Sequence, residues 1–217
     1  MKINKLLLYT SKIESTKQFY EQSLAMQVTS AGDEEIIISA GSTQLVFKHI
    51  EAQKPVYHFA FNIPDNKIEE ALEWCHQQNL QTIYFEDTEV VDFPNWNAES
   101  LYFWDNNGNI LEFIARRDLN NSVSRPFGPE QILCVSEIGI VTQDVPVFCN
   151  DLITHFGVNY YEKQPPAPNF SVIGDANGLL IAVPPNRPWF PTKITSVLYP
   201  IEITFTDAGT THQLKFN

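Results

Sequence analysis

The sequence predicts a mixed α+β protein built from one β-α-β-β-β unit that occurs roughly two and a half to three times. Three apolar segments of similar length, residues 5–10, 58–63 and 137–142, each lead within a few residues into a helical pattern. Further β patterns follow each helix, and Asp-x-Asn-Gly turns at 105–108 and 175–178 occupy corresponding places in the second and third units. Such internal repetition indicates a supersecondary module copied along the chain.

The helix of each unit is predicted from apolar spacing behind the first strand. The first helix is expected at about residues 14–24. The second is expected to begin near Asp65, because a stripe of apolar residues at i, i+3, i+4 and i+7 begins at Ile68. Asp144 occupies the equivalent place in the third unit, so both aspartates are predicted N-caps.

The other strands and the domain organisation follow from apolar alternation, turn residues and prolines. Further strands are expected at 27–30, 35–40, 44–50, 82–86, 101–104, 109–115, 159–162, 170–173, 179–183 and 201–205. The expected organisation is a pair of modules over 1–118 (1–54 and 55–118), a linker over 119–130, and a partial third module with a C-terminal strand over 131–217. Prolines within 164–168 and 184–191 make the third module an incomplete copy, since central strands exclude proline.

The acidic balance of the chain excludes several classes of partner. The sequence carries 26 acidic against 14 basic residues, a formal net charge of −12. Such a surface repels phosphate, so neither nucleic acid nor a membrane is an expected partner. No apolar run reaches the length of a membrane span, and the start of the chain is expected to form a strand, not a signal peptide. Three isolated cysteines make no disulfide framework, so a cytoplasmic location is expected.

Two ligand-capable residues stand alone in apolar strand patterns. His58 begins the segment His-Phe-Ala-Phe-Asn-Ile, and Glu112 lies within Asn-Ile-Leu-Glu-Phe-Ile-Ala. Burying such groups is unfavourable unless something binds them. The pair is therefore a candidate metal or ligand site, and the alternative is that the two residues bond each other or a lysine.

The closing motif of the second unit, Tyr-Phe-Trp-Asp-Asn-Asn-Gly-Asn-Ile-Leu-Glu-Phe at 102–113, resembles the vicinal oxygen chelate superfamily. That group includes glyoxalase I, extradiol dioxygenases, and the fosfomycin- and bleomycin-resistance proteins. Many of its members carry Asp-Pro-x-Gly-Asn, an apolar pair and Glu, and here Asn106 replaces the proline. The resemblance is strong over residues 1–116 and weaker beyond about 130. It implies that two units pair into a cupped mixed sheet, with helices outside and a divalent metal in the cup.

The resemblance places half of a ligand set in the second unit. His58 and Glu112 stand at its ligand positions, whereas the first unit offers Lys5 and the apolar pair 45–46. The family usually pairs neighbouring units from the first, so units one and two are expected to form the cup. If unit three packed against unit two instead, Glu137 would become a third ligand. Alternatively, Lys5 forms an ion pair with Glu112 in place of a metal.

Two functions from different classes follow from this resemblance. The first is a metal-dependent lyase, isomerase or dioxygenase that acts on a small oxygen-bearing molecule, with Fe, Mn, Ni or Zn as the metal. The second is a metal-free binding module that sequesters a small molecule, as bleomycin-resistance proteins do. Lys5, Tyr9, Trp96 and Trp104 are the candidate substrate-binding residues, Arg116 is expected to be solvated, and a homodimer is one expected assembly.

Overall fold

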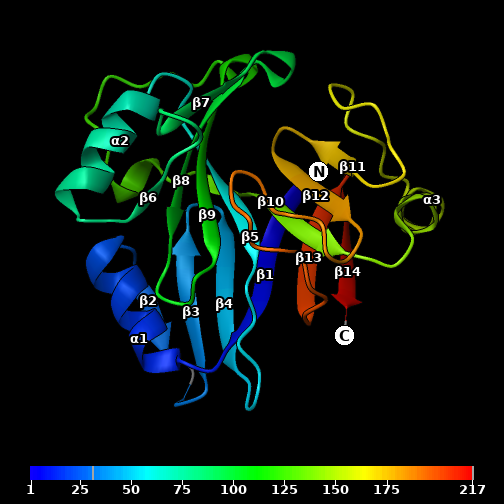
Figure 1. Ribbon diagram of the computed structural model, residues 1–217, viewed down its shortest axis with the longest axis horizontal. Helices are drawn as coiled ribbons and strands as arrows, with labels where there is room; N and C mark the ends of the chain where they lie inside the picture. The colour runs from blue at the N-terminus through cyan, green and yellow to red at the C-terminus, as the bar shows by residue number, and fades with distance from the viewer. Residues whose placement is uncertain (31, 217) are drawn as a thin grey trace.

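The computed structural model describes residues 1–30 and 32–216, and these residues form two mixed β-sheets with helices on the outside (Figure 1). The predicted α+β class and the repeated β-α-β-β-β modules are confirmed. The main apolar core draws buried side chains from both sheets, among them Leu6 and Phe47 of the first and Phe59 and Phe113 of the second.

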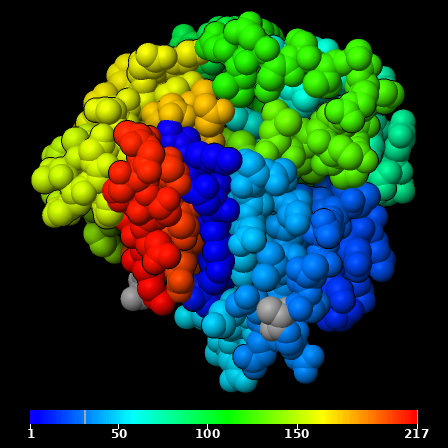
Figure 2. Space-filling view, turned by 180° about the vertical axis from the view of Figure 1, so that it is seen from behind, coloured from blue at the N-terminus to red at the C-terminus, as the bar shows by residue number. Residues whose placement is uncertain are grey.

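The first sheet joins unit one to the C-terminal end of the chain. Its strand order is β14-β13-β1-β4-β3-β2. The strands are Lys2–Thr10 (β1), Val28–Ser30 (β2), Glu35–Ala40 (β3), Thr43–His49 (β4), Ile201–Asp207 (β13) and Thr210–Phe216 (β14). β1 runs parallel to β4 and antiparallel to β13, so β13 lies inside the sheet. Figure 2 shows the blue N-terminal strand beside the red C-terminal strands.

The second sheet joins units two and three. Its strand order is β11-β12-β10-β5-β9-β8-β6, and β7 pairs with β8. The strands are His58–Ile63 (β5), Thr82–Ile83 (β6), Val90–Phe93 (β7), Ala98–Trp104 (β8), Ile110–Arg116 (β9), Cys134–Val141 (β10), Ser171–Asp175 (β11) and Gly178–Val183 (β12). The predicted strand at 159–162 is reduced to an isolated bridge between Tyr160 and Ile173.

Each unit carries its helix after its first strand, as predicted. The helices are Ile13–Gln18 (α1), continued by a π-helical turn at Phe19–Ser23, Ile68–Gln77 (α2) and Val145–Phe156 (α3). The Asp144 cap is confirmed, since its carboxylate accepts from the Val147 amide at 3.0 Å. The Asp65 cap is wrong, because α2 begins after Lys67 and Asp65 accepts instead from the Ser122 hydroxyl. No helix of the described chain is long and apolar enough to cross a membrane.

The units pair differently from the arrangement expected for residues 1–54 and 55–118. β10 of unit three lies antiparallel to β5 of unit two, whereas β1 of unit one pairs with β13. The C-terminal hairpin β13–β14 occupies the edge of β1 that a neighbouring unit would otherwise take. The sheet that contains both His58 and Glu112 is therefore completed by unit three, while the boundary at 119–130 stays a prediction.

Candidate functional site

Strand alternation places the two sequence-selected residues on one face of the second sheet. Phe59 and Phe61 of β5 enter the main core, so His58 and Ala60 face the other side. Ala60 pairs with Glu112 of β9 on one flank and with Glu137 of β10 on the other. The small Ala60 side chain leaves the space between the two carboxylates open.

A β-bulge sets the register that brings Glu137 to this place. Val135 of β10 pairs with Phe61, but the next pair joins Glu137 to Ala60, so Ser136 is an extra residue. Without that extra residue, Ser136 would stand opposite Ala60. Bulges beside functional sites commonly re-aim a side chain in this way.

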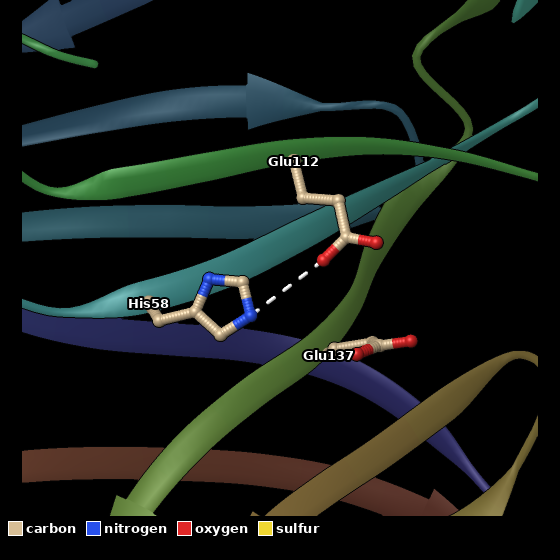
Figure 3. Close-up of side chains that lie close together, drawn as sticks. All are labelled: His58, Glu112 and Glu137. Atoms are coloured by element: carbon tan, nitrogen blue, oxygen red, sulfur yellow. Dashed lines mark ion pairs between the residues drawn. The ribbon is translucent and has the colours of Figure 1, made fainter. Parts of the chain in front are cut away.

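The three side chains converge (Figure 3). One ligand atom from each of His58, Glu112 and Glu137 lies within 4.8 Å of the other two, and all three residues are buried. His58 Nε2 lies 3.6 Å from Glu112 Oε2, the contact dashed in Figure 3. Two ligands about 2.1 Å from one ion are at most about 4.2 Å apart, so the set would draw together slightly on binding.

The local hydrogen bonds orient the site. His58 Nδ1 lies 3.1 Å from the Ile110 carbonyl, which requires the N–H on Nδ1 and leaves the Nε2 lone pair directed at the carboxylates. The Ser100 hydroxyl donates to Glu112 Oε1 at 2.6 Å. One imidazole nitrogen and carboxylate oxygens thus face the same point, and this donor set fits a divalent ion.

Burial controls the charges of the three groups. It lowers the pKa of His58 to about 4, so the imidazole is neutral at pH 7 and its contact with Glu112 is not a charge pair. Burial, and after it the Glu137 charge, raises the pKa of Glu112. Burial also raises the pKa of Glu137, against the opposing effect of Arg116. Two adjacent buried carboxylates favour a bound cation or proton.

Arg116 supplies a cation to this cluster. It was expected to be solvated, but it is 1% exposed and forms an ion pair with Glu137. Its Nε donates to Asn62 Oδ1 at 3.2 Å, and its guanidinium lies over the Trp96 ring at 5.5 Å. Its Nη1 is buried without a hydrogen-bond partner among the described residues. The charge facing the carboxylates therefore comes from Arg116, and not from the Lys5 considered as an alternative.

A cavity of about 260 Å³ opens over the three residues. Its walls are mainly aromatic and aliphatic, with polar groups at the floor and rim. The lining consists of His58, Phe93, Trp96, Tyr102, Glu112, Ile114, Glu137, Gln164, Phe170, Ile181, Arg187, Trp189 and Phe190. A concave, mostly apolar site with a few convergent polar groups is typical of small-molecule binding.

The structure separates the four candidate substrate-binding residues. Trp96 lines the cavity, and Trp104 belongs to the apolar cluster around it without lining it. Lys5 pairs with Gln44 and Thr204 in the first sheet, and Tyr9 donates to Glu202 there at 3.3 Å. Neither Lys5 nor Tyr9 lines the cavity.

Sequence reasoning missed one wall of the cavity. Gln164 and Phe170 come from one proline-containing segment and its flank, and Arg187, Trp189 and Phe190 from another. These prolines indicated an incomplete module, but the segments cover the site. The signal that was available is the Arg-Pro-Trp-Phe-Pro sequence, since arginine and large aromatics in a loop are typical of binding surfaces.

Comparisons with known proteins support the fold. The sequence matches no protein-family model and no curated protein. A candidate dioxygenase from Bacillus subtilis matches with a TM-score of 0.59 and 12% identity, over 84% of this chain and 63% of that one. A glyoxalase/bleomycin resistance protein/dioxygenase from Nocardioides matches with a TM-score of 0.45 and 20% identity, over 59% of this chain and 90% of that one. A lactoylglutathione lyase from Agrobacterium tumefaciens matches with a TM-score of 0.43 and 16% identity, over 52% of this chain and 91% of that one.

The Bacillus match establishes a shared architecture and no shared activity. The Bacillus structure supplies the overall agreement, and the present chain spans 63% of its length. The repeated β-α-β-β-β modules agree with that match. The chain therefore shares the fold of the Bacillus structure.

Proposed function

We propose that the protein binds one divalent metal ion through His58, Glu112 and Glu137 and acts on a small oxygen-bearing molecule held in the cavity above them. The observation that carries this proposal is the convergence of the three buried side chains beneath that cavity. A bound ion would act as a Lewis acid on adjacent substrate oxygens. The reaction would be that of a lyase, an isomerase or a dioxygenase.

The residues of the chain would hold and shield the substrate. Trp96, Trp189 and Tyr102 line the cavity and would exclude water from the reacting group. Of the two carboxylates, Glu137 is already paired with Arg116. Burial raises the pKa of Glu112, so Glu112 is the carboxylate that is available to take up a proton. We assign Glu112 the role of proton acceptor whenever it is not fully engaged by the ion. One imidazole and two carboxylates favour Mn²⁺ or Fe²⁺ over softer ions.

The second candidate is metal-free binding of a small molecule, and the ion pair between Arg116 and Glu137 favours it. Arg116 already compensates one carboxylate, and burial raises the pKa of Glu112, which favours a proton on the other. In this state the cluster is stable without a metal, and the aromatic cavity alone would retain a ligand.

Metal analysis separates the two candidates. The protein is purified without chelator, its metal content is measured, and Mn²⁺, Fe²⁺, Ni²⁺ and Zn²⁺ are titrated by calorimetry. We expect one equivalent of metal in the wild type and loss of it in His58→Ala, Glu112→Gln and Glu137→Gln. His76→Ala and Glu89→Gln are matched controls, because these residues form a 2.9 Å histidine–glutamate contact at the surface. A wild type that takes up none of the four ions would leave metal-free binding.

A further inference from the structure

Residues 184–196, termed the strap, contribute Arg187, Trp189 and Phe190 to the cavity wall and are fixed by the buried Ser196. The Ser196 hydroxyl donates to the Pro184 carbonyl at 2.7 Å and accepts from the Arg187 amide at 3.0 Å. The Ser196 amide donates to the Arg187 carbonyl at 2.8 Å, and the Trp189 amide donates to the Ile194 carbonyl at 2.8 Å. These bonds fix the backbone on both sides of Arg187.

The strap presents one cation to the cavity. The Arg187 guanidinium lies 4.8 Å from the centre of the Phe170 ring, and both residues line the cavity. Burial lowers the pKa of Arg187, although an arginine remains charged at neutral pH. Stacking on Phe170 orients the planar group and leaves its N–H donors available.

Arg187 lacks the acidic partners that Arg116 and Arg117 have. Arg116 pairs with Glu137, and Arg117 pairs with Asp92 and Glu99. Within residues 1–30 and 32–216, no carboxylate forms an ion pair with Arg187, and the one hydrogen bond of its side chain is a long 3.5 Å bond to the Pro188 carbonyl. A partly desolvated guanidinium without an acidic partner is suited to binding an anion from outside.

The cavity beside Arg187 favours a planar ligand. Trp96, Trp189 and Phe190 supply flat walls, and the volume of about 260 Å³ exceeds the roughly 150 Å³ of a cavity that holds benzene. A planar ring therefore fits with room for one substituent. The strap places Arg187 in the cavity wall, where its guanidinium can meet a substituent of such a ring.

We propose that Arg187 makes the cavity selective for a small planar apolar molecule that carries an oxyanion group, such as a carboxylate or a phosphonate. This proposal rests on the function proposed for the same cavity and adds its ligand class. The two acidic side chains at the floor would repel such an anion, whereas a divalent ion would balance them and leave Arg116 uncompensated. Anion preference should therefore be stronger in the metal-loaded protein.

Three matched probes test the proposal: benzoate, phenylphosphonate and neutral benzamide. Their binding is measured by calorimetry and by ligand-observed NMR, in metal-free and Mn²⁺-loaded protein. We expect at least one anion to bind about tenfold tighter than benzamide, and Arg187→Met to abolish this preference by weakening anion binding far more than benzamide binding. The stronger of the two anions identifies the oxyanion.

Two further variants keep the test independent of folding and net charge. Arg187→Lys keeps the charge without the planar fork and should retain part of the preference. Arg117→Met removes an arginine outside the cavity lining and should leave the preference intact. Equal binding of anions and benzamide by the wild type, no binding of any probe, or a preference that survives Arg187→Met would overturn the proposal. Failure of the metal proposal has a separate signature, since Mn²⁺ would then alter neither calorimetry nor probe affinity.

Discussion

Gly139 of β10 packs directly against the indole of Trp189, and a Cβ at position 139 would overlap that ring. The glycine thus lets the strap lie close over the sheet. The Trp189 ring in turn lies 5.5 Å, centre to centre, from the His58 ring. One absent side chain in β10 consequently determines how the cavity roof sits over the candidate metal ligand.

Gly139→Ala should displace Trp189 and reshape the cavity. Overpacking of this kind destabilises a protein by about 1–3 kcal/mol, and probe binding in the cavity should weaken together with stability. Urea unfolding and benzamide titration measure the two effects. Gly128→Ala is the matched control, because the one close contact of its Cβ would be with the flexible end of Glu130. Unchanged probe binding in Gly139→Ala would show that Trp189 does not shape the site.

Arg116→Met should destabilise the protein strongly. The substitution leaves Glu137 buried without its cation, and breaking such a pair costs about 3–5 kcal/mol. Combining it with Glu137→Leu should restore most of that loss, since the pair is then replaced by apolar groups. Chemical unfolding of the two single variants and the double variant gives the coupling free energy between Arg116 and Glu137. Arg117→Met, at an exposed position, should change stability by less than about 0.5 kcal/mol.

Ser100→Ala should weaken metal binding without removing a ligand. The Ser100 hydroxyl holds Glu112 Oε1, and loss of such a supporting hydrogen bond typically lowers metal affinity about 10–100-fold. Ser136→Ala is a close control, because its buried hydroxyl has no partner among the described residues. Calorimetric Mn²⁺ titration of the two variants checks this. Equal losses in both would point to general destabilisation instead.

The Glu202–Lys215 pair should give a pH-dependent stability difference in the first sheet. Lys215 Nζ lies 2.8 Å from Glu202 Oε1, and this bond lowers the pKa of Glu202. The stabilising effect is therefore present above the unfolded pKa of about 4.5 and is lost as the pH falls through the lower folded value. Glu202→Gln should be slightly less stable than wild type at pH 7 and equal to it near about pH 3.

Unfolding midpoints at the two pH values, in low and high salt, measure this difference. Salt should reduce it at pH 7, because the pair is partly exposed. Glu51→Gln serves as a control, since Glu51 is exposed and forms no ion pair in the described part of the chain. A stability difference that grew as the pH was lowered would contradict the expected sign.

The sequence predicted the fold class well because each module repeats local patterns that one stretch of chain determines. His58 and Glu112 were found for the same reason, as isolated polar residues in apolar strands. Glu137 needed two facts that are not local: the pairing of β10 with β5 and the bulge at Ser136. Arg116 was misjudged because a strand end usually meets water, whereas here Trp96 covers it.

The placement of β13 beside β1 means that the two sheets cannot close at the same stage of synthesis. Lys2 pairs with Thr206, so the first sheet can close only after residues 201–207 have been made. The second sheet needs only residues 58–183, a continuous stretch. During synthesis, the edge of β1 that β13 covers stays unpaired until those residues emerge, and premature association is expected to begin at this edge.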